Sequence, residues 1–427
     1  MSAESRWSAP RERHGRVGRR FRLLVPLVTA MLLVVQLPMP AAADHGGRPI
    51  GSGAMRCDRP VTPPRCASVG NNLKHFVFFD PSLTQDLASS LRDTMAEDYD
   101  PTKLVMIEQP EITSHTDVVA YSGDFGDNGA AGWTHCPPES RQGRNALGHR
   151  WCQEQTLWLN YNARYAAFFA DDASRDHITC HELGHTLGLR HWGNPPQSAE
   201  PAADTCMSAN TPDGPPNLHQ IDVDHINAYP YGSAPPGRGR TLAKVPMSEE
   251  TARSAWSGAS IETTQLEHPS SLAELARSAD AVVRGSVVEL VPGRVFGDSS
   301  SALHYAAATV RVDELVAGAL PSDHARELTL EIPLFDGPAS ITNLQASLPR
   351  VESVFFLRSK AASARTAGLP LEQRVAEARF YRLVVFGAVV ENQRGVATVP
   401  EGEAAFLTVL GGLPFDEVLG QVRRAGR

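Results

Sequence analysis

The segment Asp176–Gly193, DHITCHELGHTLGLRHWG, contains four histidines, one glutamate, three glycines and one cysteine. These residue types can bind a metal, and their spacing indicates which of them do so. His181 and His185 are four residues apart, so on a helix both imidazoles project from one face, about one turn apart. At that separation both rings can reach a single ion at ~2.1 Å.

The third ligand must come from beyond the helix. Gly188 can end the helix in a left-handed conformation, which turns the chain sharply and lets His191 swing back beneath it. His177 continues the row on the helix, but it lies two turns from His185, roughly 12 Å along the axis, and the two cannot share one ion. We therefore expect His181, His185 and His191 to bind the metal.

Glu182, next to the first ligand, is expected to act as a general acid and base. Three imidazole nitrogens and an open fourth position are typical of a catalytic zinc site. Zinc would lower the pKa of a water in that position, and Glu182 can accept its proton. The oxygen would then attack a carbonyl polarised by the metal, and Glu182 would return the proton to the leaving amine. The spacing thus predicts zinc-dependent hydrolysis of peptide bonds.

The complete spacing, His181-Glu182-x-x-His185-x-x-Gly188-x-x-His191, would arise by chance in about one in ten thousand chains of this composition. It resembles the signature of the metzincin zinc peptidases. The likeness extends over roughly residues 70–231, although only the zinc motif within it is sharp.

The resemblance implies roles for further residues. Met207, in DTCMSAN, would lie on a tight turn beneath the zinc, and Leu218–Tyr229 would be the closing helix of the domain. The family has an edge strand that pairs with extended substrate, and the residues that would form it are Leu157, Trp158, Leu159 and Asn160. Ala209 stands where astacin-like members have a tyrosine, and Trp192 follows the third histidine, so no subfamily is assigned.

The elements that must position these residues can be read from the same region. Apolar and alternating runs predict four strands, at Leu73–Asp80, Lys103–Gln109, Thr116–Gly123 and Glu154–Tyr161. Helical spacing predicts three helices, at Ser82–Glu97, from a Ser174 cap to Gly188, and at Leu218–Tyr229. The Gly- and Asp-rich segment from Asp124 to Pro138 is expected to be a loop.

This alternation predicts an α/β (α+β) zincin-like catalytic domain over residues 71–231, with a mixed sheet and an active-site helix. Residues 44–70 form a Pro-rich N-terminal segment, and residues 232–270 are expected to be a linker. From residue 271 to 427, β-branched runs separated by turn residues predict an all-β small barrel or sandwich domain.

The first 43 residues have the composition of a signal peptide. An Arg-rich start precedes an apolar run, Leu23–Leu37, and small residues at Ala41 and Ala43 fit a cleavage site. The alternative is an uncleaved membrane anchor, but the run is shorter than the ~20 residues that span a bilayer. We expect a secreted, extracellular protein with no stable membrane insertion after cleavage.

Charge and cysteine content fit export. The whole chain carries −8, and residues 1–43 contain seven Arg and two Glu, so the remainder carries about −13, which argues against a nucleic-acid partner. Six cysteines in an exported chain predict disulfides. Pairing of neighbours, one of fifteen possible sets, gives Cys57–Cys66, Cys136–Cys152 and Cys180–Cys206.

Three alternatives remain open for these weaker features. Pro64-Arg65-Cys66 resembles the propeptide segment with which matrix metalloproteinases block zinc, which would leave Cys57 unpaired. Cys180 could instead be a metal ligand. Asp124, Asp127 and Asn128 could bind calcium through oxygen atoms, although Asp, Asn and Gly also simply form turns.

We therefore expect a secreted zinc metalloendopeptidase whose partner is a protein or peptide substrate. A first alternative is an exported metal-containing binding or adhesion protein without turnover, against which the intact Glu182 argues. A second is a zinc amidohydrolase that acts on cell-wall peptide. The C-terminal domain shows no catalytic group of residues.

Overall fold

The computed structural model describes residues 69–137, 140–144, 150–189, 191, 205–208, 212, 214–229, 231, 262–298, 301–335, 340–347, 350–399 and 405–426. All of them belong to a single compact unit of the chain. The expected signal peptide, the Cys57–Cys66 disulfide and the Pro64-Arg65-Cys66 segment lie outside the described residues.

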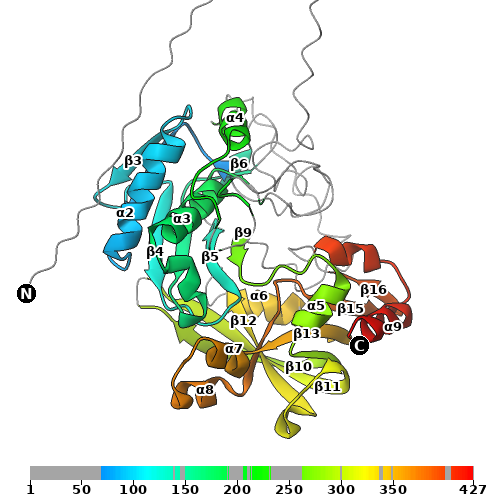
Figure 1. Ribbon diagram of the computed structural model, residues 1–427. Coiled ribbons are helices and arrows are strands. Elements are labelled where there is room, and N and C mark those ends of the chain that lie inside the picture. Colours follow the sequence, from blue (N-terminus) through cyan, green and yellow to red (C-terminus); the bar gives the residue numbers. More distant parts are fainter. Residues whose placement is uncertain are drawn as a thin grey trace, which may run out of the picture. The chain divides into compact units, whose positions relative to one another are not determined.

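The histidine segment packs on a mixed sheet of six strands in the order β3-β2-β4-β8-β5-β9 (Figure 1). The strands are β2 (Lys74–Phe79), β3 (Val105–Gln109), β4 (Val118–Gly123), β5 (Ala130–His135), β8 (Gln155–Asn160) and β9 (Glu262–Gln265). Pairs β2–β3, β2–β4 and β4–β8 are parallel, whereas β5 is antiparallel to both β8 and β9. The four parallel strands match the four that the sequence predicts, so the mixed α/β class is confirmed.

The prediction that Leu157–Asn160 form an edge strand is wrong. Strand β8 lies inside the sheet between β4 and β5, so Leu157–Asn160 have no free backbone edge to offer a substrate. The Asn160 side-chain amide donates to the Ala130 carbonyl at 3.1 Å and so joins the two strands. Alternation alone fits an edge and an interior strand equally well. The Gly-rich segment after Asp124, predicted as a loop, supplies β5 and covers that edge of β8.

Part of the predicted linker is a strand as well. Residues 262–265 form β9, the outermost strand beside β5. A four-residue strand is too short to show a period of two, which explains why the sequence did not reveal it. Residues 232–261, the rest of that segment up to β9, lie outside the described part of the chain.

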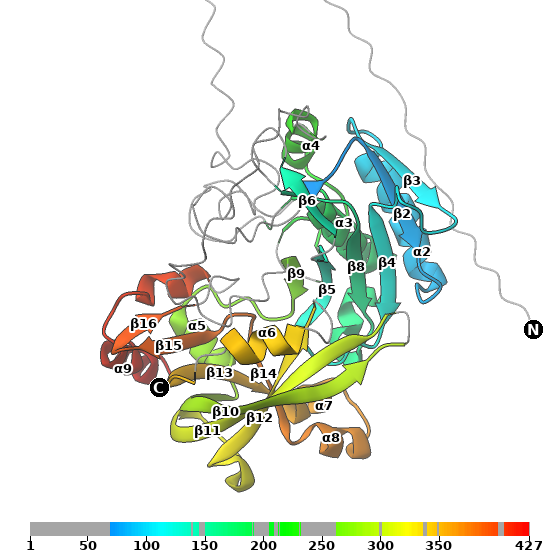
Figure 2. The same cartoon turned by 180° about the vertical axis from the view of Figure 1, so that it is seen from behind.

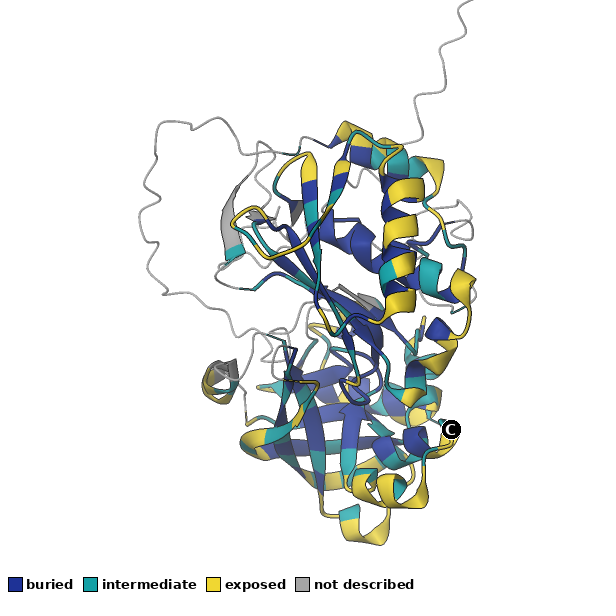
Figure 3. Ribbon diagram, turned by 90° about the vertical axis from the view of Figure 1, so that its left-hand side faces the viewer, coloured by how far each residue is buried: buried dark blue, intermediate teal, exposed yellow. Residues whose placement is uncertain are grey.

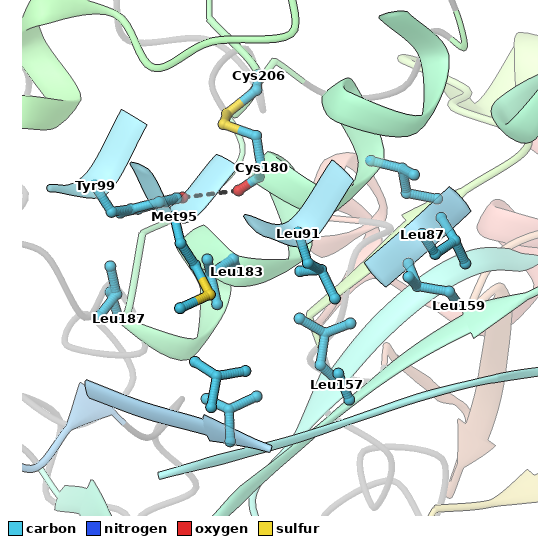
Figure 4. Close-up of a cluster of buried hydrophobic side chains, with 14 of the residues drawn as sticks. Leu87, Leu91, Met95, Tyr99, Leu157, Leu159, Cys180, Leu183, Leu187 and Cys206 are labelled. Carbon is cyan, nitrogen blue, oxygen red and sulfur yellow. Dashed lines mark hydrogen bonds between the residues drawn. A yellow bond between two sulfur atoms is a disulfide. The ribbon is translucent and has the colours of Figure 1, made fainter. Parts of the chain in front are cut away.

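Helix α2 (Gln85–Thr94) runs into a π-helical turn, Met95–Tyr99, and packs beside α3 (Asp172–Thr186). Both helices lie on the same face of the six-stranded sheet (Figures 1 and 2). An apolar stripe along this predicted helix is buried, and Figure 4 shows Leu87, Leu91 and Met95 directed at side chains of α3 and of the sheet. The stripe therefore fixes the histidine helix against a rigid support.

The start of α3 differs slightly from the prediction. Asp171, not Ser174, caps the helix: its Oδ1 accepts a hydrogen bond from the Ser174 N–H at 2.8 Å. Either side chain can cap a helix, so sequence alone does not separate them. The predicted closing helix is present as α4 (Gln220–Ala228), capped by His219.

A second mixed sheet has seven strands in the order β10-β11-β12-β14-β13-β15-β16. They are β10 (Ala281–Phe296), β11 (Leu303–Gly318), β12 (Glu327–Leu334), β13 (Ser353–Ser359), β14 (Phe380–Leu383), β15 (Val389–Gln393) and β16 (Val396–Thr398). Strand β10 also pairs with β13, so the pairings lead from β10 through β11, β12, β14 and β13 back to β10. Only β12 and β14 are parallel.

The expectation of an all-β C-terminal region is wrong, because helices accompany this sheet. They are α5 (Leu272–Ser278), α6 (Ser340–Ser347), α7 (Lys360–Thr366), α8 (Leu371–Glu377) and α9 (Phe415–Ala425). Four of the five have only seven or eight residues, too few turns for a helical period to stand out. The first halves of β10 and β11 and most of β12 and β13 are buried, whereas the second halves of β10 and β11 are exposed or half-buried (Figure 3). Among the described residues, no helix combines the length and apolarity needed to cross a membrane.

A small three-stranded sheet, β1-β7-β6, completes the described strands. Its strands are β1 (Val69–Gly70), β6 (Arg141–Arg144) and β7 (Arg150–Cys152). The predicted disulfide Cys136–Cys152 is confirmed and ties the segment after β5 to β7.

Candidate metal centre

Three histidine rings converge at the end of α3. The Nε2 atom of His185 lies 2.9 Å from Nε2 of His181 and 3.1 Å from Nε2 of His191. In a tetrahedral zinc site, nitrogens at ~2.1 Å from the ion lie about 3.4 Å from one another. The rings that the sequence predicts to meet do meet, and this group could hold a metal ion.

Gly188 produces the turn that brings the third ring back. Its φ is +92°, a conformation that strains residues with a side chain. The following N–H, of Leu189, donates to the Gly184 carbonyl at 3.0 Å and satisfies one of the last carbonyls of the helix. The reversal places His191 beside His185, with ring centroids 4.8 Å apart.

Backbone carbonyls orient the rings on the helix. Nδ1 of His181 donates to the Cys206 carbonyl at 2.7 Å, and Nδ1 of His185 donates to the Leu189 carbonyl at 2.8 Å. A proton on Nδ1 leaves the lone pair on Nε2, the atom that faces the other rings. Burial, and then the neighbouring imidazoles, hold the pKa of His181 well below its ordinary value. The ring is therefore neutral, as a metal ligand must be.

Met207 lies directly beneath the helix. It is fully buried, and a Cβ on Gly184 would collide with its Sδ atom. Glycine in the middle of a helix is unfavourable by about 1 kcal/mol relative to alanine. The close contact with Met207 explains why glycine is nevertheless found at position 184. The short turn before Met207 is held by its N–H, which donates to Thr205 Oγ1 at 3.1 Å.

Helix α4 fixes the same turn from the other side. The Thr205 hydroxyl donates to Oδ2 of Asp222, a buried residue in the first turn of α4. Asp222 also accepts the His219 N–H at 3.3 Å and so completes a capping box. The predicted closing helix therefore helps to fix the turn that carries Met207.

The predicted disulfide Cys180–Cys206 is confirmed and spans 26 residues of sequence. It joins the residue before His181 to the residue before Met207 (Figure 4). A cysteine in a disulfide does not ligate a metal as thiolate, so the alternative role for Cys180 is wrong. The hydroxyl of Tyr99 donates to the Cys180 carbonyl at 2.8 Å and adds a link to the π-helical turn that follows α2.

Glu182 is enclosed by two strands of the six-stranded sheet. Its side chain is fully buried. A Cβ on Gly132 of β5 would lie 2.6 Å from Glu182 Oε1, so only glycine leaves room there. From β9, Thr264 donates to the same oxygen twice, through its N–H at 3.2 Å and its hydroxyl at 2.5 Å. Two separate strands thus fix the carboxylate, Thr264 of β9 by hydrogen bonds and Gly132 of β5 by close packing.

His177 stays outside the ligand group, as its spacing predicts. Its Nδ1 donates to the Pro215 carbonyl at 2.7 Å, and its ring centroid lies 6.0 Å from that of His181. Burial lowers its pKa. The His177 ring packs so closely against Gly214 that a Cβ on Gly214 would collide with it. The role of His177 is therefore structural.

The residues suggested for calcium make contacts within the protein. Oδ1 of Asp127 accepts from Arg382 at 2.7 Å and from the Tyr165 hydroxyl at 2.9 Å. Burial alone would raise the pKa of Asp127, but the charges of Arg382 and Lys360 outweigh it and hold the value at about 2. The side chain of Asn128 accepts the Ala130 N–H at 2.9 Å. Turn formation and ion pairing account for these side chains.

Asp124 likewise has contacts within the protein, since its Oδ1 accepts from the Asn162 side-chain amide at 2.9 Å.

Sequence reasoning missed two residues that touch Glu182. Gly132 lies in a segment predicted as a loop, and Thr264 in a segment predicted as a linker. No local pattern marks either one, because each acquires its position by long-range strand pairing.

Comparison with known proteins adds no assignment: no protein-family model matches the chain, and neither does any curated protein.

Proposed function

We propose that this protein is an exported zinc-dependent endopeptidase of the metzincin type. The observation that carries the proposal is the convergence of the His181, His185 and His191 nitrogens, with the buried carboxylate of Glu182 next to the first of them. Ligands for a metal and a group for proton transfer thus adjoin each other on one helix.

The donor set fits zinc. Imidazole nitrogens are common zinc ligands, and three of them without a fourth protein ligand are typical of catalytic sites. The Nε2 atoms would hold the ion, since Nδ1 of His181 and of His185 is bonded to a carbonyl oxygen. When bound, zinc would lower the pKa of a water molecule and polarise the carbonyl of the bond to be cleaved.

Glu182 would carry the proton. Its Oε1, which now accepts two hydrogen bonds from Thr264, would accept a proton from the attacking water and deliver it to the leaving amine nitrogen. The fully buried position of this carboxylate limits competition from bulk solvent. Gly132 lets the neighbouring strand approach the reacting atoms closely.

Two further features support the metzincin comparison. Met207 follows a short turn and packs against Gly184 of α3, and the resemblance expects a methionine on a tight turn beneath the zinc. Strand β5 is antiparallel to its neighbour β8 and lies next to Glu182. We propose that β5, rather than β8, is the strand to which an extended polypeptide substrate adds.

Export is supported by the disulfides Cys136–Cys152 and Cys180–Cys206. Structural disulfides form in oxidising compartments and are rare in reducing ones. Together with the expected signal peptide, they support a secreted protein.

The test compares digestion of fluorescein-labelled casein by the wild type, by Glu182→Ala and by Glu182→Gln, with zinc per chain measured by mass spectrometry. Loss of the general base should lower the rate by about 10²–10⁴-fold, while zinc stays near one per chain because Glu182 is not a ligand. Equal rates of casein digestion in the wild type and Glu182→Ala would reject the proposed peptidase activity. Zinc retention without casein digestion would favour a metal-containing binding protein or, if peptide is released from peptidoglycan, an amidohydrolase.

A further inference from the structure

Strand β9 occupies the edge of β5 on which the proposed substrate would bind. The pairing is antiparallel, with Thr264 opposite Gly132 and Thr263 opposite Trp133, and Figure 1 shows β9 beside β5. The other edge of β5 is bonded to β8. Within the described part of the chain, both edges of β5 are therefore in use.

The contact between β9 and Glu182 also excludes a substrate from the proposed site. Thr264 is fully buried, and both its N–H and its hydroxyl donate to Glu182 Oε1. This oxygen is the one for which the attacking water would compete. A polypeptide on β5 would need the same backbone groups of the strand and the same face of the carboxylate, so β9 and a substrate compete for one place.

The C-terminal end of β9 is anchored independently. Just after the strand, Glu267 pairs with Arg382 at 2.9 Å, with Arg358 at 3.2 Å and with Arg164 at 3.6 Å. The N–H of Leu266 donates to the Gly129 carbonyl at 2.9 Å. The ion pairs of Glu267 involve no residue of β5, so residues 262–265 can leave β5 while Glu267 stays fixed.

We propose that β9 is an internal strand that blocks the polypeptide-binding edge of β5 and covers Glu182, and that the site opens when this strand leaves β5. The proposal rests on the proposed function, since it concerns access to the same carboxylate. It makes the protein self-inhibited by residues 262–265 of its own chain, and a substrate gains access only in the open state.

A disulfide lock tests the proposal directly. Thr134 and Glu262 lie opposite each other in the register, and opposite residues of antiparallel strands have Cα separations that a disulfide can span. Thr134→Cys with Glu262→Cys should hold β9 on β5. As a matched control, Thr309→Cys with Thr329→Cys places a disulfide between β11 and β12 in the second sheet.

With the bonds verified by mass spectrometry, the first lock should reduce digestion of fluorescein-labelled casein at least tenfold, and the matched lock should leave it at the wild-type rate. Amide hydrogen exchange over residues 262–265 should slow in the first lock only. Undiminished casein digestion by a fully locked chain would overturn the proposal.

A second variant loosens the strand. Thr264→Val removes the hydroxyl that donates to Glu182 but keeps the branched shape, and Thr309→Val makes the same change in β11. A lost hydrogen bond to a charged group should accelerate amide exchange in β9 about tenfold or more, and casein digestion should rise in parallel. Exchange in β9 that matches the Thr309→Val control would overturn the proposal.

The two proposals fail separately. If no variant digests casein but both exchange results are as expected, the peptidase is rejected and the removable strand is supported. If the wild type and the locked chain digest casein equally, the peptidase stands and the inhibitory role of β9 is rejected.

Discussion

The two large sheets bury polar side chains in contrasting ways. Around the second sheet, the buried carboxylate of Glu331 is neutralised by opposite charges: Lys360 Nζ lies 2.6 Å from Glu331, and Arg294 lies 2.6 Å from the same carboxylate. Beside the first sheet, His181 and His185 instead direct like atoms at each other, nitrogen to nitrogen. Among the residues that the structure describes, a group placed to hold a metal occurs only there.

The difference separates groups that stabilise a fold from groups prepared for a ligand. An ion pair that is complete within the protein requires nothing further. Imidazoles whose lone pairs converge gain little from one another, and a cation between them makes the arrangement favourable. All six cysteines also precede residue 207, so cross-links are confined to the half of the chain that contains the histidine group.

The sharpest test of this contrast removes a ligand. His185→Ala should weaken zinc binding by more than the ~10–100-fold that loss of an outer hydrogen-bond partner costs, because it deletes one of three converging nitrogens. Zinc affinity is measured by competition with a chromophoric chelator. His304→Ala, in β11 of the second sheet, is the control. Equal zinc affinity in both variants would contradict the assignment of the metal centre.

The next largest effect concerns a buried ion pair. Arg382→Met should destabilise the protein by about 3–5 kcal/mol, because the Asp127 carboxylate stays buried without its main cation. Arg423→Met, which removes a half-exposed partner of Glu314, should cost no more than about 1 kcal/mol. Urea unfolding monitored by circular dichroism measures both, and similar losses in the two variants would show that burial is not decisive.

Two glycines with positive φ give a smaller and more selective effect. Gly188→Ala and Gly368→Ala, at φ +92° and +70°, should each lose about 1–2 kcal/mol of stability from backbone strain. Only Gly188→Ala should also lower zinc affinity, since it alone controls the turn to His191. A loss of zinc binding in Gly368→Ala, which lies at the end of α7 with nothing within 4 Å of an added Cβ, would argue for a general folding defect.

The last prediction concerns the pH dependence of stability. Burial raises the pKa of Asp117 from 3.8 to about 7, so the folded state binds this proton more tightly than the unfolded state. Stability should therefore fall as pH rises from about 4 to about 7, by at most about 1.4 kcal/mol per pH unit. Asp117→Asn should flatten this slope in urea unfolding, and the exposed Asp86→Asn should preserve it. A slope unchanged in Asp117→Asn would assign it to other groups.

In the second sheet the sign is reversed. Burial by itself would raise the pKa of Glu331, but the charges of Lys360 and Arg294 prevail and lower it. Its contribution to stability is therefore present at neutral pH and is lost only as the solution becomes acidic, below its ordinary value of 4.5.

The parts of the molecule that the sequence predicted well are those set by short-range spacing. His181 and His185 share a face because a helix repeats every 3.6 residues, and Gly188 marks the turn because few other residues adopt its φ. The neighbouring cysteine pairs likewise lie in segments that meet around this helix. Such features need no knowledge of distant parts of the chain.

The parts that the sequence did not predict depend on long-range pairing. Strand β5 consists largely of small residues, and its place is decided by β8 on one side and β9 on the other. Whether a strand lies inside a sheet or at its margin depends on those partners, which explains the error over Leu157–Asn160. The helices of the second sheet were missed for a different reason, since their short lengths give too few repeats.

The position of β9 also affects how the protein can be divided. A shortened chain that ended at Tyr231, the limit of the catalytic region predicted from sequence, would lack the last strand of the first sheet. It would present unpaired N–H and C=O groups along β5, a template on which further copies can add and aggregate. A fragment intended for expression should therefore extend beyond Glu267, so that the sheet keeps its own outermost strand.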